Sequence, residues 1–84
     1  MISLLRFAEA MAMELENNSH KTGWYQCSDA WLLKRLRQEV GELERAIQQA
    51  KPLKDVISEA ADVANFAYFL ADNYARIYTE DPTP

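Results

Sequence analysis

Apolar residues recur at three- and four-residue intervals along most of the chain, which is the spacing of amphipathic helices. The expected helices span residues 3–17, 28–50 and 53–78. Ser28 is a favourable N-cap for the second helix. Lys51 and Pro52 interrupt the pattern, and proline is tolerated in the first turn of the helix that follows. Because this break is short, the second and third helices should lie side by side and antiparallel.

The second helix should have one apolar stripe. That stripe is expected to contain Trp31 or Leu32, then Leu36, Val40, Leu43 and Ile47. Gly41 interrupts the same helix, and a mid-helix glycine costs about 1 kcal/mol relative to alanine. It indicates close approach of another backbone or of a ligand, and helix packing explains it equally well. On the first helix, Glu14 is expected to point away from the apolar face.

The middle of the third helix, AADVANFAYFLA, is apolar on nearly all sides. A helix of this kind is normally buried, but two companion helices cannot surround it. We therefore expect a homodimer or homotetramer in which third helices meet. The predicted fold class is all-α: a three-helix antiparallel protomer within an oligomeric helical bundle. Residues 1–84 should form a single domain, with a loose polar tail at 79–84.

Composition narrows the functional classes. The net charge of −4 argues against a nucleic-acid-binding surface. Acidic residues are spread through the first 16 positions, so neither a signal peptide nor a membrane span is expected. Cys27 is the only cysteine, which excludes an intrachain disulfide and suits a reducing cytoplasm.

Two pairs of carboxylates stand out within the predicted helical hairpin. Glu39 and Glu42 are three residues apart on the second helix, and Glu59 and Asp62 are three apart on the third. Such residues are neighbours on a helix surface, and both pairs lie at similar heights from the turn. Four converging carboxylates would repel one another unless a cation joined them. Oxygen ligands favour Mg²⁺ or Mn²⁺; alternatively, two of these residues are merely solvated.

The linker at 18–27 carries Lys21 and Trp24 in a short, non-periodic segment. An aromatic ring and a lysine in a loop can hold a nucleobase by stacking and a phosphate by charge. Alternatively, Trp24 covers the open end of the bundle. The single histidine of the chain, His20, also lies in this linker. A di-iron bundle, which needs Glu-x-x-His pairs, is thereby excluded.

The segments QEVGEL at 38–43 and EAADVANF at 59–66 resemble the signature of the MazG-like, all-α nucleoside triphosphate pyrophosphohydrolases. The linker and following helix, HKTGWYQCSDAWLLKRL, are similar to a phage-type dATP/dGTP pyrophosphohydrolase subgroup. The resemblance covers residues 17–73 and implies a magnesium-dependent hydrolase. Gln38 stands where many relatives have a further glutamate. By this resemblance, the magnesium ligands would be Glu39, Glu42, Glu59 and Asp62.

The implied reaction is attack of water on the α-phosphorus, which yields a nucleoside monophosphate and pyrophosphate. The expected roles are Glu39 as proton acceptor, Lys21 on phosphate, Trp24 on the base, and Asn65 on the sugar or on a metal-bound water. Many relatives add a further helix with basic residues for the phosphates. Here we expect that charge from Lys21, Lys51, Lys54 or a second subunit.

Two alternatives stay open. One is a non-catalytic helical module that oligomerises through its third helix. The other is a sister activity, such as phosphoribosyl-ATP or dUTP pyrophosphohydrolysis.

Overall fold

The computed structural model describes residues 1–17 and 23–79, and within these ranges it contains helices and no strand. The elements are α1 (Leu4–Asn17), the short 3-10 helix η1 (Trp24–Gln26), α2 (Asp29–Gln48) and α3 (Leu53–Thr79). The all-α prediction and its three helices are therefore confirmed for this part of the chain. Lys21 lies outside the described residues, as does the expected tail beyond Thr79, which is itself the last residue of α3.

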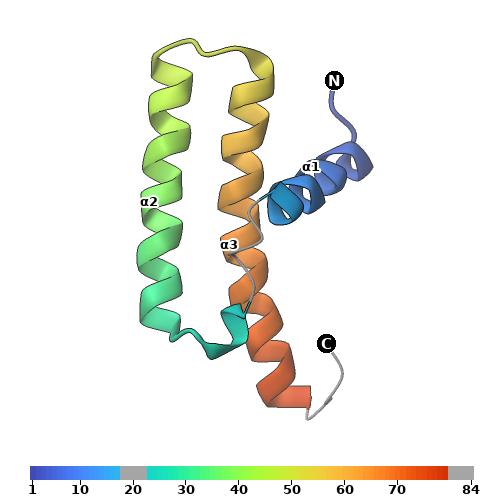
Figure 1. Cartoon of the computed structure of the whole chain (residues 1–84), viewed down its shortest axis with the longest axis vertical. Helices are drawn as coiled ribbons and strands as arrows, with labels where there is room; N and C mark the ends of the chain where they lie inside the picture. The colour runs from blue at the N-terminus through green and yellow to red at the C-terminus, as the bar shows by residue number, and fades with distance from the viewer. Residues whose placement is uncertain (18–22, 80–84) are drawn as a thin grey trace.

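The long helices α2 and α3 form an antiparallel hairpin, and α1 crosses α3 at an angle on the side away from α2 (Figure 1). α3 is the common element of the fold, because α1, η1 and α2 all pack against it. Among the described helices, none combines the length and the apolar character that a membrane span requires.

The ends of α2 follow from local chemistry. Ser28 caps its start, with the Ser28 hydroxyl accepting a 3.1 Å hydrogen bond from the Trp31 backbone N–H. At the other end Ala50 has φ +51°, in the left-handed region. The backbone N–H groups of Ala50 and Lys51 return to the carbonyls of Ile47 and Ala46, a Schellman arrangement that terminates a helix. α2 therefore ends at Gln48 rather than at residue 50.

The core lies where α2, α3 and η1 meet. Its fully buried members are Leu32, Phe66 and Phe69, with Trp24 and Leu36 packed against them. The rings of Phe66 and Phe69 meet edge to face, with their centroids 5.2 Å apart. This aromatic arrangement fixes the end of the hairpin farthest from the α2–α3 turn.

The predicted apolar stripe of α2 is wrong at two positions. Val40 and Ile47 are 47% and 60% exposed, whereas the buried residues of α2 are Leu32, Glu39 and Ala46. Val40 and Ile47 each come one residue after a buried residue, Glu39 or Ala46. The predicted and the buried residues therefore form neighbouring lines on α2. α3 covers the face that contains Glu39, so the buried line of α2 includes a carboxylate where the apolar pattern had placed Val40.

Gly41 does not mark close packing against another described part of the chain. A Cβ built on it would have no heavy atom within 4 Å. Of the explanations left open for Gly41, packing against another described part of the chain is therefore excluded, and approach of a ligand stays a prediction.

Candidate functional site

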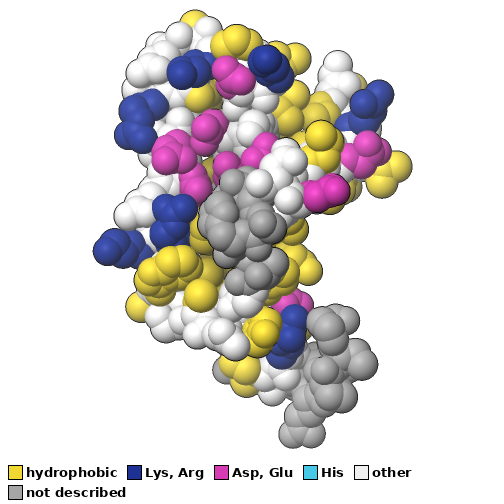
Figure 2. Space-filling model, in the orientation of Figure 1, with side chains coloured by type: hydrophobic (Ala, Val, Ile, Leu, Met, Phe, Trp, Pro, Cys, Tyr) yellow, Lys and Arg dark blue, Asp and Glu magenta, His cyan; other side chains and the backbone are white. Residues whose placement is uncertain are grey.

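Three glutamates from α2 and α3 converge at the middle of the hairpin. One carboxylate oxygen from each of Glu39, Glu42 and Glu59 lies within 4.8 Å of the other two. Glu39 and Glu42 are one turn apart on α2, and the antiparallel pairing brings Glu59 of α3 to the same level. Acidic side chains gather over this region, and basic ones surround the turn end of the hairpin (Figure 2). We call these three residues the carboxylate cluster.

Glu39 is the most enclosed member of the carboxylate cluster, with 5% of its side chain exposed. Its Oε1 accepts a 3.2 Å hydrogen bond from Arg35 Nη2, one turn earlier on α2. Arg35 also donates to the Gln38 side chain, and its guanidinium lies 5.1 Å from the centre of the Phe66 ring. Arg35 thus orients the Glu39 carboxylate and compensates part of its buried charge.

Within the carboxylate cluster, Glu59 has a raised pKa, so its negative charge is disfavoured. Burial raises the pKa of its carboxyl, and the negative charge of Glu42 raises it further. Smaller contributions in the same direction come from Asp62 and Glu14. Glu59 Oε2 is also buried, with no hydrogen-bond partner among the described residues. A carboxylate surrounded by like charges, with an oxygen left over, is stabilised by either a proton or a bound cation.

Asp62, the fourth predicted ligand, lies outside the carboxylate cluster. It is half-buried, and its charge still acts on Glu59. The structure thus brings three of the four predicted ligands together and leaves Asp62 beside them.

Glu14 of α1 is an acidic residue that the sequence pattern misplaced. We expected it to point away from the apolar face, but it is half-buried against α3 and accepts a hydrogen bond from the Ser58 hydroxyl. Its charge contributes to the raised pKa of Glu59. Nothing in the spacing of α1 identifies this contact, because it depends on the angle at which α1 crosses α3.

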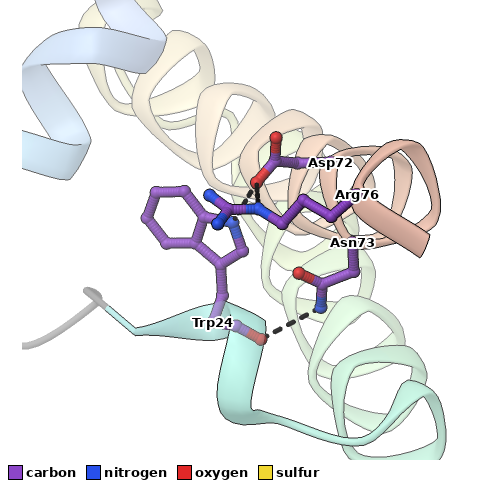
Figure 3. A network of polar contacts seen from close by, with 4 residues as sticks. All are labelled: Trp24, Asp72, Asn73 and Arg76. Atoms are coloured by element: carbon purple, nitrogen blue, oxygen red, sulfur yellow. Dashed lines mark hydrogen bonds and ion pairs between the residues drawn. The ribbon is translucent and has the colours of Figure 1, made fainter. Parts of the chain in front are cut away.

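Trp24 lies at the core rather than in the carboxylate cluster. Its ring stacks on Phe69 with a centroid distance of 4.4 Å and an interplanar angle of 16°. Its Nε1–H donates to Asp72 at 3.0 Å, and its carbonyl accepts from Asn73 (Figure 3). Arg76 also donates to Asp72. The indole hydrogen bond is the main cause that lowers the pKa of Asp72, and Arg76 lowers it further. One face of the ring is therefore occupied by Phe69, and stacking on a base stays a prediction.

Asn65 ties α1 to α3. It is almost fully buried, and its Nδ2 donates a 3.0 Å hydrogen bond to the Met11 carbonyl. Its Oδ1 is buried with no partner among the described residues. This placement gives Asn65 a structural contact with α1, and the predicted contact with a sugar or water stays untested. Lys21, the predicted phosphate ligand of the linker, is among the residues that are not described.

The carboxylate cluster opens into a pocket of about 250 Å³ that extends toward the α2–α3 turn. Glu42 and Glu59 of the cluster line this pocket, and Glu39 does not. The remaining lining residues are Arg45, Ala46, Gln49, Lys51, Asp55 and Ser58. Of the two lysines expected near this turn to serve as phosphate ligands, Lys51 lines the pocket and Lys54 does not.

No family model, curated protein or solved structure matches the chain. Its function is therefore inferred from the residues of this site.

The donor set fits a hard divalent cation. All three members of the carboxylate cluster offer oxygen, the ligand that Mg²⁺ and Mn²⁺ prefer. The buried Oε2 of Glu59 and the raised pKa of its carboxyl are the features that such a cation would relieve. Glu39, Glu42 and Glu59 would hold the ion.

Replacing Glu59 by glutamine is expected to stabilise the metal-free protein at neutral pH. The folded pKa of Glu59 is raised, so its contribution to stability is complete below the unfolded pKa of about 4.3 and is lost as pH rises through the folded value. Glu59→Gln removes this loss. We expect a gain of about 0.5 kcal/mol, or about 2–4 °C, at pH 7, and almost none at pH 4.

Thermal melts in EDTA at the two pH values measure this difference. Added Mg²⁺ should reverse the order, because an ion that binds only the folded state stabilises it and the variant lacks a ligand. A variant that melts below the wild type in EDTA at pH 7 would contradict the proposed repulsion.

Proposed function

We propose that the protein is a magnesium-dependent hydrolase that cleaves nucleoside triphosphates at the α-phosphorus, giving a nucleoside monophosphate and pyrophosphate. The observation that carries this proposal is the carboxylate cluster opening into a pocket that also contains basic side chains. Acidic residues alone would repel a polyphosphate, and basic residues alone would bind it without an ion site. A pocket with both suits a metal–polyphosphate complex. The motif resemblance around residues 38–43 and 59–66 points to the same reaction.

Each residue of the site takes a role in this proposal. Glu39, Glu42 and Glu59 hold the ion, with Asp62 beside them as a further candidate ligand. A bound Mg²⁺ would lower the pKa of a water ligand and neutralise charge on the phosphates. Glu39 is the proposed proton acceptor, because Arg35 fixes the orientation of its carboxylate. Proton acceptance requires hydrogen-bond reach of the attacking water, which a carboxylate of fixed orientation beside the ion would provide.

Self-association accompanies the proposed activity. Leu33, Val40 and Ile47 recur at seven-residue intervals on an exposed face of α2. Tyr68, Tyr74 and Ile77 are exposed on α3. The exposed face of α2 and these exposed side chains of α3 support the proposed homodimer or homotetramer. The free thiol of Cys27 supports a reducing cytoplasmic location.

A substrate panel tests the function. Purified protein with Mg²⁺ is incubated with each dNTP and NTP, dUTP and phosphoribosyl-ATP, and pyrophosphate and orthophosphate are measured separately. We expect pyrophosphate release from at least one deoxynucleoside triphosphate other than dUTP, abolished by EDTA. Release from phosphoribosyl-ATP or dUTP alone would assign a sister activity. No release from any nucleotide would contradict hydrolysis, and the exposed apolar faces would then favour a non-catalytic helical interaction module.

A further inference from the structure

Two basic side chains share the pocket with the acidic residues. Arg45 lies on α2 three residues after Glu42, on the side of the α2–α3 turn. Lys51 lies within that turn. Within the described part of the chain, neither forms an ion pair at 4.0 Å or less, although Glu42, Asp55 and Glu59 line the same pocket. Both cationic groups therefore remain available to an anion that enters the pocket.

We propose that Arg45 and Lys51 bind the β- and γ-phosphates of the substrate, so that the polyphosphate tail points toward the α2–α3 turn. This inference rests on the proposed function, since it takes the α-phosphorus to lie at the carboxylate cluster. The tail would then extend from the cluster along the pocket, away from Glu39 and toward Lys51.

Charge and chemistry support this direction. Among the described residues, the only cationic side chains that line the pocket are Arg45 and Lys51, and both follow Glu42 in the direction of the α2–α3 turn. Arg45 offers a planar fork of donors that matches phosphate oxygens, and Lys51 adds a second positive charge. The turn fixes the backbone that carries Lys51, because the Lys51 N–H donates to the Ala46 carbonyl at 3.0 Å.

A purely structural role makes a different prediction. Arg45 lies in the last turn of α2, where a positive charge stabilises the helix dipole. If this were its only role, removing it would lower the melting temperature slightly and leave phosphate binding unchanged. Binding of inorganic tripolyphosphate, which needs no hydrolysis, separates the two roles.

The experiment compares two double variants. Arg45→Gln with Lys51→Gln removes the two pocket charges, and Lys34→Gln with Arg37→Gln removes one lysine and one arginine from exposed positions of α2 that do not line the pocket. Each changes the net charge from −4 to −6, so long-range repulsion is matched. Calorimetric titration with tripolyphosphate in Mg²⁺ measures the affinity for a polyphosphate. A second titration uses a nucleoside monophosphate, which lacks the terminal phosphates.

We expect the pocket variant to bind tripolyphosphate at least about tenfold more weakly than the control variant, since charge-assisted hydrogen bonds are lost. Monophosphate binding should differ between them by less than about threefold, because the terminal phosphates are absent. The exchange Arg45→Lys with Lys51→Arg keeps both charges and should retain most of the tripolyphosphate affinity. If the double glutamine variant does not fold, the single variants Arg45→Gln and Lys51→Gln carry the same test.

Equal tripolyphosphate affinity in the pocket and control variants would overturn the inference, as would an equal loss of monophosphate binding. These results are independent of turnover. If the wild type hydrolyses nucleotides and the pocket variant keeps its KM and its tripolyphosphate affinity, the inference fails and the proposed function stands. If tripolyphosphate binding depends on Arg45 and Lys51 but no nucleotide is hydrolysed, the proposed function fails and the phosphate site stands.

Discussion

Replacing Glu42 by glutamine is expected to lower the rate of pyrophosphate release by about 100-fold or more while the protein stays folded. Glu42 belongs to the carboxylate cluster and also lines the pocket, so the change removes a charged oxygen ligand from the proposed ion site. Loss of even an outer-shell partner costs about 10–100-fold at metal sites. The side chain is exposed, and glutamine has a similar helix propensity to glutamate, so stability should change little.

The matched control is Glu44→Gln. Glu44 is an exposed glutamate on the same helix that belongs neither to the carboxylate cluster nor to the pocket lining. Both variants change the net charge equally, and only Glu42→Gln should lose activity. Steady-state assays at saturating Mg²⁺, with circular dichroism to verify folding, provide the measurement. Equal activity in the two variants would remove Glu42 from the catalytic site.

Replacing Phe69 by alanine is expected to destabilise the fold by about 3–5 kcal/mol. Phe69 is 2% exposed, and its ring packs between Trp24 and Phe66. The truncation leaves a cavity and removes the stacking surface of the indole. Domains of this size have only about 5–15 kcal/mol of stability. The truncation would therefore remove a large part of the free energy of unfolding. Urea denaturation followed by circular dichroism measures the loss.

Ile77→Ala is the control for this change, since Ile77 lies on the same helix and is 65% exposed. Its effect should stay within about 0.5 kcal/mol. A Phe69→Ala variant as stable as this control would mean that Trp24 and Phe69 do not form the core. The indole would then be available for the base stacking that its position in the linker suggested.

The helices themselves could be read from the sequence because their signals are local. Three- and four-residue periodicity, the Ser28 cap and the break at Pro52 each act over a few residues, and α1, α2 and α3 begin and end near the expected positions. The end of α2 differs because Ala50 adopts a left-handed conformation. That conformation is usual for glycine and uncommon for alanine, so composition gave no indication of it.

The buried face of α2 could not be predicted from the sequence in the same way. Leu32 and Leu33, and the positions seven and fourteen residues beyond each, form two adjacent lines on the helix, and the second line is the more apolar because it continues with Val40 and Ile47. The buried line continues with Glu39. Hydrophobic periodicity treats a buried carboxylate as a surface residue, so the predicted stripe took Val40 and Ile47 from the second line in place of Glu39 and Ala46 from the first.

The carboxylate cluster could be predicted because the geometry of a single helical hairpin brings its three residues together. Glu39, Glu42 and Glu59 meet because α2 and α3 are antiparallel and their turn is short. Contacts that depend on the crossing of α1, such as that of Glu14 with Ser58, have no counterpart in the local pattern. The pairing of Arg35 with Glu39 is an i,i+4 contact, and its spacing alone could have revealed it.

Titration with Mn²⁺ followed by electron paramagnetic resonance tests the proposed ion site most directly, because the signal of free Mn²⁺ falls as the ion binds. Wild-type protein should bind Mn²⁺ saturably, Mg²⁺ should displace it, and Glu42→Gln together with Glu59→Gln should weaken binding at least about tenfold. Two results would contradict the proposal that the carboxylate cluster holds an ion: a wild type that leaves Mn²⁺ free, or a double variant that binds Mn²⁺ as tightly as the wild type. Either result would also contradict the proposed metal-dependent hydrolysis.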